Sequence, residues 1–313
     1  MSRTYKATGI NLKSMPMGEA DRLLTILTRE FGLVRAVAPG ARKHNSRMAG
    51  RSEPFVVNEL LIAKGRSLDK VTQAETLESY PGLAQNLPKL IASQYLAELA
   101  LYQALSDQPQ EELFYLLNEH LGRIERSSSD QILARLTHAV FQLLVLAGLA
   151  PQVHLCGVTR QEIQPDLSDP DWRCGFSIPL GGTVTQAALE QLIGQNRPVL
   201  KPKSASSPGS ANFPADRGLK PTSTKLTAVT SSPRRSGPTG YGNLRLAAAE
   251  VVILQRLAES ELPTDLFQKN LERIWHSVER VLRQYAEYHL DHVVRSAGLI
   301  DTCFNPADPS LPV

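Results

Sequence analysis

The chain has 313 residues, of which 42% are hydrophobic and 21% are charged. This composition is ordinary for a soluble globular protein, and the length allows two domains with separate cores. Three cysteines are too few for a disulfide framework, so we expect a reducing compartment, the cytoplasm. We expect neither a signal peptide nor a membrane span, because no apolar run approaches roughly 18–20 residues.

The net charge of +3 is mild, but basic residues gather near the N-terminus, where residues 1–80 hold 13 Lys and Arg against 8 Asp and Glu. Between residues 35 and 51 there are five basic residues and no acidic one. A basic connector held between two strands can lie along a polyanion, which predicts nucleic-acid binding. A solvated surface loop is the alternative for a charge run alone.

The first eighty residues favour β-structure, because short apolar and β-branched runs alternate with turn residues. Ser14–Gly18, which contains Pro16, is expected to form a break after the first strand. Glu30-Phe31-Gly32 predicts a tight hairpin turn. A helix over Leu23–Thr28 remains an alternative, since short apolar runs are ambiguous. The predicted strands cover residues 5–12, 23–28, 33–38, 55–63 and 68–77.

Five strands with one long connection after the third are typical of a small closed Greek-key barrel. The best-known barrel of this kind is the OB-fold, which carries an oligonucleotide-binding face. We therefore expect an α+β protein with an OB-fold domain over residues 1–80.

From Pro81 onward, apolar residues recur at three- and four-residue spacing, which predicts a helical domain over residues 81–196. Helices are expected at residues 87–105, 113–124 and 132–149. Ser127–Asp130 predicts a helix break followed by an N-cap, and Gly148 with Pro151 should end the third helix.

The segment around residues 152–185 has no helical pattern, and it predicts a small irregular excursion, either β or rich in turns, followed by a short helix near residues 186–193. Residues 197–242 are rich in Pro, Ser, Thr and Gly, with basic residues and the single acid Asp216, so we expect a disordered linker. Residues 243–257 and 263–289 predict the C-terminal helices of the helical domain, within residues 243–300. Residues 301–313 are expected to form a frayed tail.

Neither a metal site nor a catalytic site is predicted. Cys156 lacks a second cysteine at position 159, which is Thr, and Cys174 also stands alone. His289 and His292 predict an exposed polar helix end. Glu19 and Asp21 beside Arg22 are expected to hold a turn. With no recognisable catalytic motif, we expect no enzyme and no cofactor.

Two N-terminal segments resemble the start of the RecO family, bacterial mediators of DNA repair and recombination. They are Gly18-Glu19-Ala20-Asp21-Arg22-Leu23-Leu24-Thr25 and Gly32-Leu33-Val34 through Pro39-Gly40-Ala41-Arg42-Lys43, and Arg51-Ser52-Glu53-Pro54-Phe55 also fits. The resemblance is sharp over residues 1–80 and looser to about residue 195 and from 243 to 300. It implies an OB-fold joined to a helical domain with a zinc-finger-like excursion.

The resemblance implies binding to single- and double-stranded DNA and annealing of strands coated by single-stranded-DNA-binding protein (SSB). It implies as partners the C-terminal tail of SSB, RecR and, indirectly, RecA, and a location in the cytoplasm on the nucleoid. The DNA-contacting surface would comprise Arg35, Arg42, Lys43, Arg47, Arg51, Lys64 and Arg66. Many family members carry paired cysteines in the excursion, whereas this chain has only Cys156 and Cys174, so no metal is expected.

The residues themselves leave two other functions open, a generic RNA-binding OB module and a scaffold that contacts only proteins. Aromatic side chains in the first domain are few: Tyr5, Phe31, Phe55 and Tyr80. Few side chains are therefore available for base stacking, so affinity for nucleic acid should depend on charge. About five to seven phosphate contacts predict a single-strand salt slope of roughly −3.5 to −5.

Overall fold

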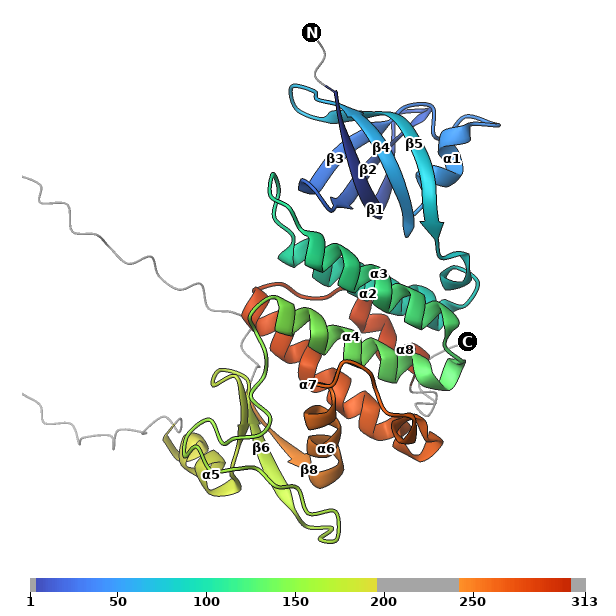
Figure 1. Cartoon of the computed structure of the whole chain (residues 1–313). Helices are drawn as coiled ribbons and strands as arrows, with labels where there is room; N and C mark the ends of the chain where they lie inside the picture. Colours follow the sequence, from blue (N-terminus) through green and yellow to red (C-terminus); the bar gives the residue numbers. More distant parts are fainter. Residues whose placement is uncertain (1–3, 196–241, 305–313) are drawn as a thin grey trace, which may run out of the picture.

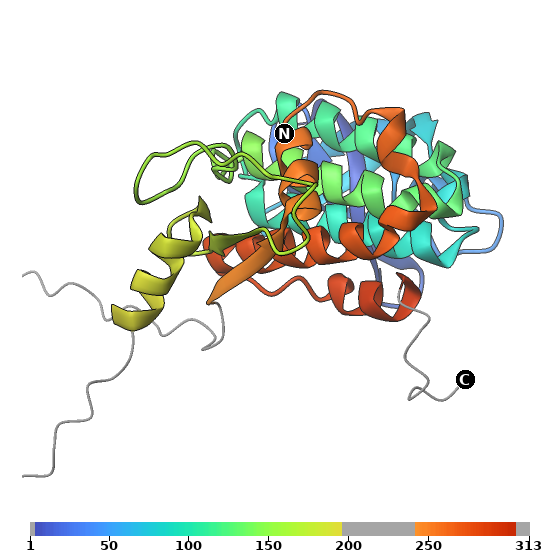
Figure 2. The same ribbon diagram turned by 90° about the horizontal axis from the view of Figure 1, so that it is seen from below.

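The computed structural model describes residues 4–195 and 242–304, as a β-barrel seated on a helical body (Figure 1). Most of the predicted linker over 197–242, and residues 305–313 of the predicted tail, lie outside the described residues, whereas residues 301–304 are helical and not a frayed tail. No helix among the described residues combines the length and apolar character that a membrane crossing requires. Seen from below, the helices overlie the barrel and α5 projects to one side (Figure 2).

The barrel confirms the predicted fold class and the five strands, which close in the order β1-β2-β3-β5-β4. All neighbours are antiparallel except β3 and β5, which pair over Ala36–Asp69 and Val37–Lys70. The segment that was ambiguous with a helix is β2, and it forms the predicted hairpin with β3. The strands are β1 Thr4–Met17, β2 Asp21–Thr28, β3 Gly32–Ala38, β4 Val56–Ala63 and β5 Asp69–Ser79.

The predicted interruption is wrong for residues 14–17, because β1 continues through Pro16 to Met17, and is correct only at Gly18. The strand pairs with β4 only as far as Ile10 and thereafter with β2 alone. Its second half is therefore open on one side, where the missing N–H of a proline is tolerated. The turn falls instead at Gly18, whose φ is +60°.

The helical body follows a short 3-10 turn, η1 (Pro81–Leu83). The three predicted helices after it are confirmed, and Gly148, with φ +72°, follows the end of α4 as expected. The helix break predicted at Ser127–Asp130 is confirmed, but the residue at the N-cap position of α4 is Gln131, which makes no side-chain capping bond. The helices are α2 Leu87–Gln103, α3 Glu111–Arg126, α4 Ile132–Leu146, α6 Ala248–Arg256, α7 Glu272–Leu290 and α8 Ile300–Phe304, with short 3-10 turns between several of them.

The helical domain also contains a three-stranded sheet, which agrees with the β alternative predicted for the excursion but includes one strand, β8 (Asn243–Ala247), that was not predicted. Strands β6 (Arg173–Ser177) and β7 (Gly182–Val184) belong to the excursion, and α5 (Gln186–Gln195) follows them. The sheet order is β7-β6-β8, and β8 begins the segment predicted as a C-terminal helix. Leu244 and Leu246 alternate with Arg245 and pair with β6, so this pairing overrides helix propensity.

Two apolar cores hold the chain together. The smaller one fills the upper barrel with side chains such as Leu24, Ile26 and Ile62. The larger one combines helical side chains with five from the lower barrel: Ile10, Leu12, Leu27, Phe55 and Val57. The barrel is therefore closed at its lower end by the helical body, not by its own residues.

The body contains a partly buried ion cluster between α7 and α8. Glu279 is only 1% exposed, and its carboxylate lies 3.2 Å from Nη2 of Arg283. The same Arg283 nitrogen lies 2.9 Å from Asp301. Burial raises the pKa of Glu279 to about 7, although Arg283 opposes the shift.

The cluster predicts a stability that falls as pH rises. In the unfolded chain a glutamate loses its proton near about pH 4.3. Between about pH 5 and pH 7 the folded state therefore holds a proton that the unfolded state lacks, and the free energy of unfolding decreases through this window. We expect Glu279→Gln to remove roughly 1–3 kcal/mol of this decrease between pH 5 and pH 8. Urea unfolding of the wild type and of the variant at each pH measures the free energy of unfolding. An equal dependence of this free energy on pH in the two proteins would contradict the assignment of the effect to Glu279.

The contact between Gly32 and the α2–α3 loop predicts a second effect. Gly32 has φ +64°, and a Cβ there would lie 2.1 Å from the carbonyl oxygen of Leu105 and 2.5 Å from that of Gln108. We expect Gly32→Ala to destabilise the protein by about 3 kcal/mol or more in urea unfolding, because backbone must move. Gly18→Ala is the matched control, since Gly18 has φ +60° with nothing within 4 Å. Its cost should be about 1–2 kcal/mol, and equal costs would show that the barrel–body contact does not matter.

Candidate nucleic-acid interface

The basic connector, defined as residues 39–55, leaves β3 and returns at β4 at the side of the barrel (Figure 1). It contains a helix that was not predicted, α1 (Arg47–Arg51), with Ser46 as its N-cap. Asn45 and Phe55 adopt φ +61°, which is uncommon for residues other than glycine. The connector is therefore a defined structure with bends at both sides of α1, not an extended loop.

Two buried asparagines fix the end of the connector. Nδ2 of Asn11 donates to the carbonyl oxygens of Arg51 and Glu53 at 2.8 and 2.9 Å. Nδ2 of Asn58 donates to the same carbonyl of Arg51 at 2.9 Å. Both asparagines are 0% exposed, and the N–H of Phe55 donates to the carbonyl oxygen of Asn11. These bonds to buried groups hold α1 against the barrel.

The start of the connector is tied to the β1–β2 turn. Asp21 accepts a hydrogen bond from the N–H of Gly40 at 2.8 Å, which agrees with its expected role in holding a turn. The N–H of Arg42 donates to the carbonyl oxygen of Ala20, and its Nη1 donates to that of Gly18 at 2.8 Å. Arg42 thus serves the fold with part of its guanidinium group, leaving other N–H donors for a ligand.

The predicted DNA-contacting residues lie on the barrel surface. Six are exposed, and Arg51 is half-buried at the end of α1. Lys64 lies 4.0 Å from Asp107, while the other six form no ion pair with any carboxylate among the described residues. The connector contributes Arg42, Lys43, Arg47 and Arg51, strand β3 contributes Arg35, and the β4–β5 loop contributes Lys64 and Arg66.

Strand pairing adds Lys70, which was not among the predicted residues. Lys70 lies opposite Val37 on the neighbouring strand, two residues along from Arg35. Arg35 and Lys70 are both exposed, so they extend the positive surface from the connector across the β3–β5 seam. The sequence could not indicate this, because only the parallel register brings the two strands together.

The outer surface of β4 and β5 has the opposite charge. Glu59 and Glu75 face each other across the two strands, and Glu78 lies further along β5. All three are exposed, and within the described part of the chain only Glu59 has a basic partner, Lys6 at 3.6 Å. A polyanion is therefore repelled from this surface and is directed to the connector side.

The aromatic residues of the barrel are largely withdrawn from its surface. Phe55 and Tyr80 are 5% and 6% exposed and belong to the larger core. Tyr5 is half-buried and stacks edge-on with Phe31, which is 37% exposed. The open surface therefore offers far more basic side chains, which attract phosphates, than aromatic side chains on which bases could stack.

The cysteines of the excursion are buried and free. Sγ of Cys156 accepts hydrogen bonds from the N–H groups of Thr159 and Thr185. Burial raises the pKa of Cys156, but the hydrogen bonds from these threonines outweigh it and bring the pKa to about 6. Burial raises the pKa of Cys174 to about 11. No group of three or more metal-ligating side chains occurs in the described part of the chain.

The geometry defines a class of protein, a small OB-type barrel with a positively charged connector, seated on a helical body. Family comparison identifies the class further. The model described as recombination protein O N terminal matches residues 1–80, and recombination protein O C terminal matches residues 84–201. The chain belongs to the RecO family.

Relatives called DNA repair protein RecO match over nearly the whole chain. One from a Nostoc species is 52% identical over 307 residues, covering 97% of each chain. One from Acaryochloris marina is 51% identical over 312 residues, covering 98% of this chain and 97% of its own. One from Gloeobacter violaceus is 42% identical, covering 97% and 95%.

We predict that the hydrogen bonds from the two buried asparagines keep the backbone of the connector ordered. Asn58→Ala removes a buried hydrogen bond to the carbonyl oxygen of Arg51, which should lower the free energy of unfolding by about 1–3 kcal/mol. We expect faster cleavage by trypsin at the connector's basic residues, detected by mass spectrometry of the fragments. Thr72→Val is the control, because it removes an exposed side-chain bond to Leu61 on the same barrel. Equal cleavage rates in both variants would contradict the anchoring role.

Proposed function

We propose that this protein is a DNA-binding recombination mediator in DNA repair. The observation that carries the proposal is the anchored basic connector, whose cations lie free of ion pairs with the described residues on one side of an OB-type barrel. Membership of the RecO family supports it, as do relatives called DNA repair protein. The protein performs no chemical step in this role.

The barrel and the connector act by neutralising phosphates. Arg35, Arg42, Lys43, Arg47, Arg51, Lys64 and Arg66 bind the backbone of single or double strands without reading bases. Because the connector is held by hydrogen bonds, little ordering entropy is lost when a strand binds. The acidic outer surface of β4 and β5 restricts the strand to one path.

The helical domain serves protein partners in this proposal. Those partners are the C-terminal tail of SSB and RecR, and RecA is reached indirectly. In the cytoplasm, on the nucleoid, the protein binds two SSB-coated strands and promotes their annealing. Residues 1–80 would then be the DNA-binding domain, and residues 81–196 with 243–300 the domain that positions it on its partners.

Charge reversal on the connector tests the proposal. We expect Lys43→Glu with Arg47→Glu to weaken single-strand binding at least tenfold and to reduce the magnitude of the salt slope by roughly 0.7 for each phosphate that is no longer neutralised. Both residues are exposed and take no part in the hydrogen bonds that anchor the connector. Arg273→Glu, exposed on α7, is the matched control. Fluorescence anisotropy across a salt series measures both quantities.

The same charge-reversal variant should no longer accelerate annealing between complementary strands coated with SSB. Binding that is independent of salt would contradict the charge-led mechanism. Tighter binding to RNA than to matched DNA would favour an RNA-binding module. Unchanged DNA binding after charge reversal would favour a protein-only scaffold.

A further inference from the structure

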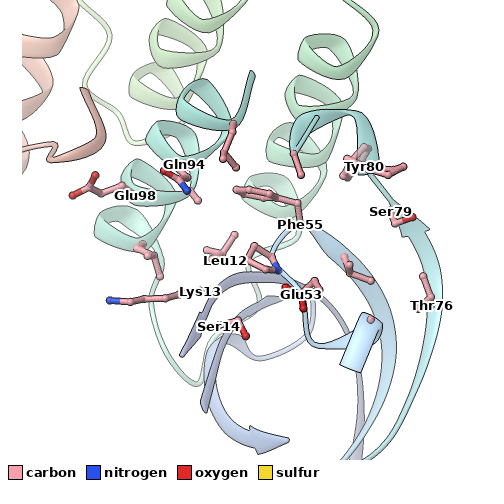
Figure 3. Close-up of a pocket in the computed structure, with 18 of the residues that line it drawn as sticks. Leu12, Lys13, Ser14, Glu53, Phe55, Thr76, Ser79, Tyr80, Gln94 and Glu98 are labelled. Carbon is pink, nitrogen blue, oxygen red and sulfur yellow. The ribbon is translucent and has the colours of Figure 1, made fainter. Parts of the chain in front are cut away.

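A cleft of about 1030 Å³ lies between the barrel and α2 and opens beside the connector (Figure 3). Leu12 and Phe55 lie between Gln94 and Glu98 of α2 on one side and Thr76 and Ser79 of β5 on the other. Leu90, Ala97 and Leu101 add apolar surface from α2. We call it the barrel–helix cleft; it has an apolar interior and hydroxyl and amide groups at its sides.

The charges around the cleft favour an anionic ligand. Of the two carboxylates that line it, Glu53 pairs with Arg22 at 2.7 Å, which leaves the one negative charge of Glu98 against the two positive charges of Lys13 and Arg295. Glu98 accepts hydrogen bonds from the N–H groups of Arg295 and Ser296 at 3.0 Å and from two hydroxyls. The cations Lys13 and Arg295 also line the cleft, are exposed, and form no ion pair within the described residues.

The cleft continues the proposed DNA surface. Gly50, Glu53 and Pro54 of the connector form part of its wall, and Gly50 directly precedes Arg51. At the same place Phe55 is held at φ +61° by its hydrogen bond to Asn11. A bulky residue in this conformation is strained, and the buried anchors compensate for that strain. The bend points the connector's end, with its aromatic side chain, into the cleft.

We infer that the barrel–helix cleft receives unpaired bases of a single DNA strand whose phosphates lie along the connector, with Lys13 and Arg295 binding the phosphates at its mouth. This inference rests on the proposed function. Bases present apolar faces and polar edges, which match the leucine-lined interior and the side groups of Ser14, Thr76 and Gln94. Bases inside a duplex are stacked and paired, so the cleft distinguishes single strands from double strands.

The experiment compares three ligands of the full-length protein by fluorescence anisotropy. They are an oligothymidylate, an abasic phosphodiester strand of the same length, and a duplex. The wild type should bind the oligothymidylate about tenfold more tightly than the abasic strand, because the abasic strand offers no bases to the cleft. Gln94→Trp fills the cleft from an exposed helix position, which limits damage to the fold. It should reduce oligothymidylate affinity to the abasic level and leave duplex binding unchanged.

Arg295→Glu should weaken single-strand binding severalfold more than the control Arg273→Glu, with circular dichroism checking that each variant folds. Equal affinity of the wild type for the two strands, or a preference that survives Gln94→Trp, would overturn the inference while leaving connector binding intact. Loss of annealing of SSB-coated strands by Gln94→Trp with normal binding of bare strands would mean that the cleft takes a protein segment instead. Absence of binding to all three ligands would contradict the proposed function itself.

Discussion

The structure depends on one shared apolar core. Ile10, Leu12, Leu27, Phe55 and Val57 come from the barrel but pack with the helices, and each buried side chain of this kind contributes about 1.5–3 kcal/mol. The barrel is thus fixed in orientation on the body instead of being tethered to it. The close contact of Gly32 with the carbonyl of Leu105 permits no sliding at the other side of the junction.

This fixed orientation determines where function can lie. Phe55 belongs both to the shared core and to the end of the connector, so packing of the two domains also positions the basic surface. The cleft exists for the same reason, since its two walls belong to the barrel and to α2. A change in the core is therefore expected to affect ligand binding even where it touches no charged residue.

Much of the fold could be predicted because most elements carry their own signal. The barrel strands show apolar runs between turn residues, and α2, α3 and α4 show helical periodicity. Strand β8 was missed because its only described partner, β6, lies far away along the chain, and its five residues precede a helix. Helix α1 was missed because five residues with a glycine have little helical signal; a serine cap and tertiary hydrogen bonds define it.

The candidate site, too, could be predicted only in part from the sequence. The cations of the connector are visible in the sequence as a run without acids, but what makes the run a surface is not. Asn11 and Asn58 look like ordinary strand polar residues, and only burial beneath the carbonyl of Arg51 reveals their role. Lys70 joins the basic surface only through the parallel pairing of β3 with β5. Arg295 lines the cleft although it lies near the opposite end of the chain. Charge pattern thus predicts the class of ligand, whereas tertiary contacts decide which cations act together and whether bases have a place to go.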